Sequence, residues 1–231
     1  MLSPTPIDDL DRAIEIRRAF LVGYQDSAYA ERYAQLVGEV REAERALHTG
    51  RTDLANAVVR SYFKLLAIKD EYEVARLHVD SDFVESVRAQ FEGDAKVAFH
   101  MAPPIFGTRR LPSGEPRKMA FGPWMIPVLR VLARMRSVRG SALDVFRHSA
   151  ERHADREMLA QYEADVRAML DVLHGPQGRA KHAVAVALAS LPMEIRGYGH
   201  VRMRGMEKVR AEGTALRVKL VEPVEQAIAA D

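Results

Sequence analysis

Along most of this chain the apolar residues recur every three or four positions, the spacing that places side chains on one face of an α-helix. The first such stretch covers residues 7–47 and is interrupted between Gly23 and Ser27, where Asp26 or Ser27 is suited to cap a second helix. A third helix is predicted over residues 53–78. Further helices are predicted over residues 81–91, 123–140, 151–173, 180–191 and 200–222.

The period changes within residues 96–122. Residues 97–101 alternate in apolar character, which indicates a β-strand, and residues 119–121 are suited to pair with it. The intervening residues are rich in Gly, Pro and basic residues and predict a long loop. We expect a mainly α-helical fold with one small β-hairpin near residues 96–122. The predicted organisation is a flexible N-terminus (1–9), a single helical domain (10–222) and a frayed C-terminus (223–231).

Four charged residues stand where the helix predicted over 53–78 needs a buried face. Asp70 interrupts an apolar stripe, and Lys69, Glu73 and Arg76 lie one turn apart beside it. Three interpretations are open: a solvated face with i,i+4 ion pairs, a buried structural ion cluster, and acid–base chemistry by Asp70 or Glu73. We favour the structural cluster, in which burying any member unpaired would cost about 3–5 kcal/mol.

Composition narrows the classes of function. The chain has 34 Lys and Arg against 32 Asp and Glu, a formal net charge of +2, so nucleic-acid binding is disfavoured unless the positive charge is clustered. It has no cysteine, which excludes disulfides, thiolate zinc sites and iron–sulfur clusters held by this chain. No apolar run is long enough to cross a membrane, and the first residues do not read as a signal peptide. We therefore expect a cytoplasmic protein without a membrane partner.

The densest positive segment runs from Arg117 to Arg139. It holds six basic residues and no Asp or Glu, and Arg130 and Arg134 share one helical face. It also holds the chain's one tryptophan, Trp124, which is suited to packing or to contact with a partner. The alternatives are a solvated helix surface, a surface for an acidic partner, and a site for a phosphate-bearing cofactor.

A second basic segment surrounds two glycines near the last predicted helix. Arg196 and His200 are candidates for binding an anion, because a Gly-x-Gly turn before a helix can present backbone N–H groups. Without a preceding strand this signal is weak. The sequence contains no phosphate-binding loop, complete dinucleotide fingerprint or metalloprotease motif, and we predict no catalytic residue and no metal site.

Five segments in this order resemble the C-terminal domain of the long indolepyruvate ferredoxin oxidoreductases and related 2-oxoacid oxidoreductases. They are AFLVGYQDSAYAERYAQLV, FKLLAIKDEYEVARL, AQFEGDAKVAFHMAPP, RKMAFGPWM and EIRGYGHVR. The resemblance covers residues 10–210.

This resemblance implies an accessory domain of an enzyme that oxidatively decarboxylates aryl pyruvates to acyl-CoA and passes electrons to ferredoxin. Thiamine diphosphate, magnesium, CoA and iron–sulfur clusters are then expected only in partner domains, with none in this chain. The expected partners are the catalytic and gamma-type domains, with ferredoxin as an indirect partner. Docking is expected through the Arg-rich helix after Trp124 and the loop at residues 107–118. The alternatives are a CoA- or substrate-binding component and, more weakly, a free-standing nucleic-acid binder.

Overall fold

The computed structural model describes residues 10–79, 89–90, 98–101, 117–197 and 199–223, apart from the side chain of His200. Within these residues it contains eight α-helices, two short 3-10 helices and one two-stranded antiparallel sheet. This confirms the predicted mainly α-helical fold with a small hairpin. The predicted helix over 81–91, most of the long loop and the two predicted terminal segments lie outside the described residues, apart from Ala89, Gln90, Arg117, Lys118 and Pro223.

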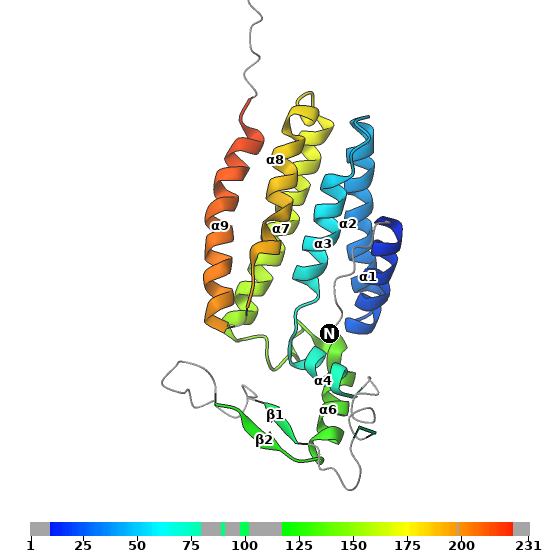
Figure 1. Ribbon diagram of the computed structural model, residues 1–231, viewed down its shortest axis with the longest axis vertical. Coiled ribbons are helices and arrows are strands. Elements are labelled where there is room, and N and C mark those ends of the chain that lie inside the picture. The colour runs from blue at the N-terminus through cyan, green and yellow to red at the C-terminus, as the bar shows by residue number, and fades with distance from the viewer. Residues whose placement is uncertain (1–9, 80–88, 91–97, 102–116, 198, 224–231) are drawn as a thin grey trace, which may run out of the picture. The chain divides into compact units, whose positions relative to one another are not determined.

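The chain divides into two compact units. The first comprises Met1–Ala67 with Ser149–Asp231, and the second comprises Ile68–His148. The predicted single domain spans residues 10–222, and the division between the two units falls inside that segment. Each unit is described separately below, with the labels of Figure 1.

The first unit is a bundle of helices that run alongside one another (Figure 1). Stacked tyrosine rings fill its centre: the ring centroids of Tyr33 and Tyr62 are 5.8 Å apart, and those of Tyr62 and Tyr162 are 6.1 Å apart. All three side chains are buried, so they join three helices through apolar contact. The helices are α1 (Leu10–Tyr24), α2 (Ser27–Ala46), α3 (Asp53–Leu66), α7 (Ala150–His174), α8 (Gly178–Ser190) and α9 (Gly199–Val221), with the 3-10 helix η3 (Leu191–Glu194) between the last two.

Local chemistry explains two boundaries in this unit. Of the two predicted caps, Asp26 and Ser27, it is Asp26 that caps α2, because its Oδ1 accepts the N–H of Tyr29 at 2.8 Å. The turn between α7 and α8 needs glycine at Gly178, where a Cβ would overlap the carbonyl oxygen of Leu173.

The second unit packs two helices and the hairpin around a small core. Its helices are α4 (Glu71–Val79) and α6 (Met125–Arg134), followed by the 3-10 helix η2 (Met135–Val138). Strands β1 (Phe99–Met101) and β2 (Met119–Phe121) pair with Phe99 opposite Phe121. The core consists of the buried residues Ala75, Phe99, Met125, Leu129 and Ala133.

The prediction of one continuous helix over 53–78 is wrong. Helix α3 ends at Leu66 and α4 begins at Glu71, with non-helical backbone between them. The cause is Asp70, whose side chain accepts the N–H of Glu73 and so starts a new helix. The apolar stripe that Asp70 seemed to interrupt therefore belongs to two helices in two units.

Candidate functional site

Asp70, one of the four charged residues of the predicted cluster, is buried and bound by both backbone and side chain. Its side chain is 1% exposed, and Oδ1 accepts the backbone N–H of Glu73 at 2.7 Å. The guanidinium of Arg139 binds both carboxylate oxygens, Nε to Oδ2 at 2.6 Å and Nη2 to Oδ1 at 3.0 Å. A two-pronged contact of this kind fixes orientation as well as charge. Asp70 thus begins α4 and holds the residue that follows η2.

The contacts continue from Arg139 through an aromatic ring to a second buried carboxylate. The Arg139 guanidinium lies 5.5 Å from the ring centroid of Tyr72, and the Tyr72 hydroxyl donates to Asp144 at 3.0 Å. Asp144 also accepts the N–H groups of Gly140 at 2.8 Å and Phe146 at 3.0 Å. Burial, and then the hydrogen bond to Asp144, raise the pKa of Tyr72, so its hydroxyl remains a donor. We call Asp70, Tyr72, Arg139 and Asp144 the Asp70 network.

The other members of the predicted cluster lie differently. Glu73 and Arg76 form a two-pronged ion pair within α4, with distances of 2.7 and 2.8 Å. Lys69 is exposed and precedes α4, so Lys69 and Glu73 do not share one helix and the i,i+4 geometry of an ion pair does not apply to them. Because Asp70 and Glu73 are buried and bound to arginines, their arrangement favours a role in stabilising the fold. Acid–base chemistry needs a carboxylate that a substrate can reach.

Helix α6 has two apolar faces, one buried and one exposed. Its inner face supplies Met125, Leu129 and Ala133 to the core of the second unit. The outer face carries apolar side chains at i, i+4, i+7 and i+11, a spacing that keeps them on one line along the helix. We call these four residues the α6 outer face: Trp124 is 62% exposed, Val128 49%, Val131 57% and Met135 37%.

Arg130 and Arg134 flank this stripe. Both are exposed, and neither guanidinium has an ion-pair or hydrogen-bond partner among the residues the structure describes. From the helical period they lie on the same edge of the stripe, opposite to the edge that leads to the buried face. Trp124 contacts Phe121 of β2 edge to face at 5.9 Å between ring centroids, which fixes one end of the α6 outer face against the hairpin.

The predicted anion site near the last helix is only partly described. Arg196 is exposed in the turn before α9, next to Gly197, whose φ is +80°, while the side chain of His200 lies outside the described residues. Lys64 Nζ donates to the carbonyl oxygens of Ile195 at 2.6 Å and Met193 at 3.1 Å. Burial, and then the charges of Arg202 and Arg196, lower the pKa of Lys64. Arg202 itself binds Asp155, so in this cationic group Lys64 and Arg202 already have partners.

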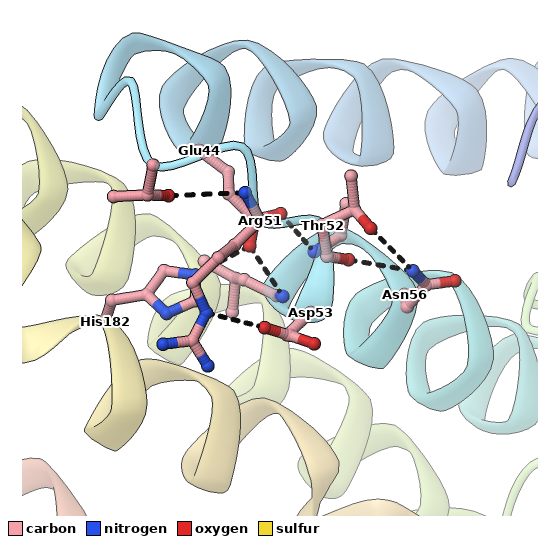
Figure 2. Close-up of polar contacts among 9 residues, drawn as sticks. Glu44, Arg51, Thr52, Asp53, Asn56 and His182 are labelled. Carbon is pink, nitrogen blue, oxygen red and sulfur yellow. Dashed lines mark hydrogen bonds and ion pairs between the residues drawn. The ribbon is translucent and has the colours of Figure 1, made fainter.

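The sequence did not predict a buried carboxylate–imidazole pair, formed by Glu44 and His182. Figure 2 shows Glu44 at the end of α2 and His182 of α8 meeting at the start of α3. Glu44 Oε1 lies 2.6 Å from His182 Nε2 and accepts the N–H of Leu54 at 2.9 Å, while Oε2 accepts the N–H of Ala55 at 2.9 Å. His182 Nε2 is therefore the donor, and its buried Nδ1 has no partner in the described part of the chain.

This pair is a structural cap and not a reaction centre. The side chains of Glu44 and His182 are 2% and 3% exposed, which leaves no approach for a substrate. Thr52 occupies the N-cap position of α3, but its side chain accepts no backbone N–H of the helix, so Glu44 satisfies N–H groups that a local cap would otherwise bind. The sequence signal that could have found it is the position of Glu44, a charged residue that directly follows Ala43 in the apolar stripe of α2.

Within the described residues, no group of three or more His, Cys, Asp or Glu side chains is placed to hold a metal ion. In the same part of the chain, no helix combines the length and the apolar character needed to cross a bilayer.

The fold and surface define a helical domain with a small hairpin and an exposed helix that is both apolar and basic. The chain belongs to a family of unknown function, DUF6537, whose model matches residues 10–215. Comparisons with curated proteins and with solved structures found no match.

We predict that Asp70→Ala destabilises the second unit by about 3–5 kcal/mol, because it leaves the Arg139 guanidinium without its buried partner and removes the cap of α4. Asp70→Asn should lose less, since asparagine also caps helices. Trp124 is the chain's one tryptophan and lies in this unit, so its fluorescence during urea unfolding measures the loss. Lys69→Ala, at the exposed neighbour, is the control. Equal stability of the two alanine variants would contradict a structural role for Asp70.

We also predict that Glu44→Ala lowers the free energy of unfolding by about 3 kcal/mol, because two backbone N–H groups and the His182 imidazole lose their acceptor inside the bundle. Far-UV circular dichroism during urea unfolding is the suitable measurement, since most helical residues lie in the first unit. Glu42→Ala, an exposed change in the same helix, should leave stability almost unaltered. A Glu44 variant as stable as the Glu42 variant would refute the capping role.

Proposed function

We propose that this chain is an accessory interaction domain of a thiamine-diphosphate-dependent 2-oxoacid:ferredoxin oxidoreductase of the indolepyruvate type. On this proposal it is not catalytic alone, and it docks on the catalytic and gamma-type proteins. These partners hold thiamine diphosphate, magnesium, CoA and the iron–sulfur clusters, and pass electrons to ferredoxin. A cytoplasmic location belongs to the same proposal and agrees with the absence of cysteine.

One observation carries the proposal: the five sequence segments that resemble this enzyme family occur in the same order across residues 10–210. They contribute to both units, since the first lies in α1 and α2 and the fourth leads from β2 to α6. A resemblance spread over both units is what a whole accessory domain requires.

The α6 outer face supports docking. A contiguous exposed apolar stripe on a folded domain marks a contact surface, and Trp, Met and Arg are residue types enriched in protein interfaces. The described carboxylates Asp70 and Glu73, by contrast, are occupied by structural ion pairs. The geometry therefore favours an interaction domain over an enzyme acting alone.

The test mixes the purified chain with the catalytic and gamma-type proteins of an indolepyruvate ferredoxin oxidoreductase. We expect the chain to co-elute with at least one of them in size-exclusion chromatography and to raise indolepyruvate-dependent ferredoxin reduction. Bovine serum albumin at the same concentration controls for crowding. Separate elution from every partner, with unchanged reduction, would remove the proposal.

A second candidate function is binding of CoA through the cationic group at the start of α9. The observation that favours it is geometric: Lys64 Nζ donates to the carbonyl oxygen of Ile195 at 2.6 Å, and the exposed Arg196 is the next residue. Isothermal titration with CoA should then give heat that Arg196→Gln abolishes, because the phosphates lose the exposed guanidinium of the group. Arg45→Gln, another exposed arginine of the same unit, is the control. No heat with CoA eliminates this candidate.

A further inference from the structure

We infer that the α6 outer face binds an amphipathic helix of a protein partner, one with carboxylates at i and i+4 along one edge of its apolar stripe. This inference rests on the proposed function, because that helix is expected in the catalytic or gamma-type protein. It goes further by assigning the contact residues and the chemistry of the surface they recognise.

The shape of the surface selects a helix. Trp124 and Met135 are eleven residues apart, so the stripe is about 16 Å long and one or two side chains wide. A ridge of these dimensions matches the apolar stripe of one partner helix, and helix-on-helix packing joins such ridges and grooves. The inner face of α6 is buried in the core, and the Trp124–Phe121 contact holds its N-terminal end, so the stripe is presented on a fixed support.

The charges select an acidic edge on the partner. Arg130 and Arg134 are one turn apart, with a rise of about 6 Å between them, and they are unpaired among the described residues. No Asp or Glu occurs from Arg117 to Leu143, so the segment itself supplies no counter-charge. Two carboxylates one turn apart on a partner helix match this spacing, and each can accept a guanidinium through both oxygens.

A second copy of this chain does not fit that description. An antiparallel symmetric pairing of two α6 outer faces places Arg130 and Arg134 of one copy beside the same residues of the other, and a parallel pairing leaves them without a carboxylate in this segment. Like charges opposed across a desolvated contact cost affinity, and the segment offers no acid to offset them. The arginines therefore oppose self-association through this stripe.

A lipid surface fits less well than a protein helix. Helices that lie in a membrane interface present basic residues toward the phosphates that surround their apolar face. Here the exposed arginines flank the stripe on one edge only, and the other edge leads into the core of the unit. Positive charge on one edge of a narrow apolar stripe matches a partner helix that has acidic residues along one edge of its own stripe.

The experiment measures binding of the purified chain to the immobilised catalytic and gamma-type proteins by biolayer interferometry. We expect Val128→Gln with Val131→Gln to raise the dissociation constant about tenfold or more, and Arg130→Gln with Arg134→Gln to do the same. Arg130→Lys with Arg134→Lys should recover only part of the loss, because lysine keeps the charge but not the two-pronged contact. Raising the salt concentration should weaken the wild-type chain more than the Arg→Gln variant.

Matched controls make the same chemical changes elsewhere. Val218→Gln alters a valine of α9 that is 50% exposed, against 57% for Val131, and Arg156→Gln with Arg167→Gln removes two exposed charges from α7. Both controls should bind like the wild type. Unfolding followed by Trp124 fluorescence verifies that each outer-face variant is folded.

Four results overturn the inference. If the wild-type chain binds and the outer-face variants bind equally well, the inference fails while the proposed function stands. If the wild-type chain binds neither partner protein, the proposed function fails and the inference fails with it. Sedimentation as a dimer that Val131→Gln dissociates would identify a second copy as the occupant. Binding to phosphatidylserine vesicles that tolerates Arg→Lys at both positions would identify a lipid surface instead.

Discussion

The second unit depends on the buried ion pair between Asp70 and Arg139. A carboxylate with 1% exposure is strongly unfavourable unless every oxygen is satisfied, and here the Glu73 N–H and the Arg139 guanidinium do this together. The two residues are 69 positions apart, and the segment between them contains the hairpin, α6 and η2. The pair therefore fixes the two ends of a long stretch of chain, and Asp144 extends the hold through Tyr72 to the residues that follow.

In the first unit, too, a buried carboxylate caps the start of a helix. Glu44 comes from the end of one helix and binds the first N–H groups of the next, so a buried charge again decides where a helix begins. In both units the carboxylate gains a side-chain donor from a distant part of the sequence, Arg139 for Asp70 and His182 for Glu44. Each helix start is thereby coupled to tertiary structure, and the helix forms fully only when the distant partner is in place.

Features of this fold that depend on neighbouring residues can be predicted from the sequence, whereas contacts between residues far apart in the chain cannot. The cap at Asp26 and the pairing of residues 99–101 with 119–121 depend on neighbours, and both are predicted correctly. The break before Glu71 is missed because the apolar spacing of α3 continues by coincidence across residues 67–70 into α4. The partners Arg139 and His182 lie 69 and 138 positions from their carboxylates, beyond any periodic signal. The basic face of α6, with Arg130 and Arg134, can be recognised in the sequence. Which of its two apolar faces is buried depends on tertiary packing and cannot be.

Helix α6 poses a problem of specificity that its charges resolve. A helix with two apolar faces can be buried on either, and an exposed stripe of Trp124, Val128, Val131 and Met135 favours non-specific association. The core contacts of Met125, Leu129 and Ala133, with the Asp70–Arg139 pair beyond the end of η2, select the buried face. Arg130 and Arg134 then restrict what reaches the other face, because a partner without carboxylates in register must strip water from two guanidinium groups and leave them unpaired. The apolar stripe supplies the area for binding, and the arginines supply the selection.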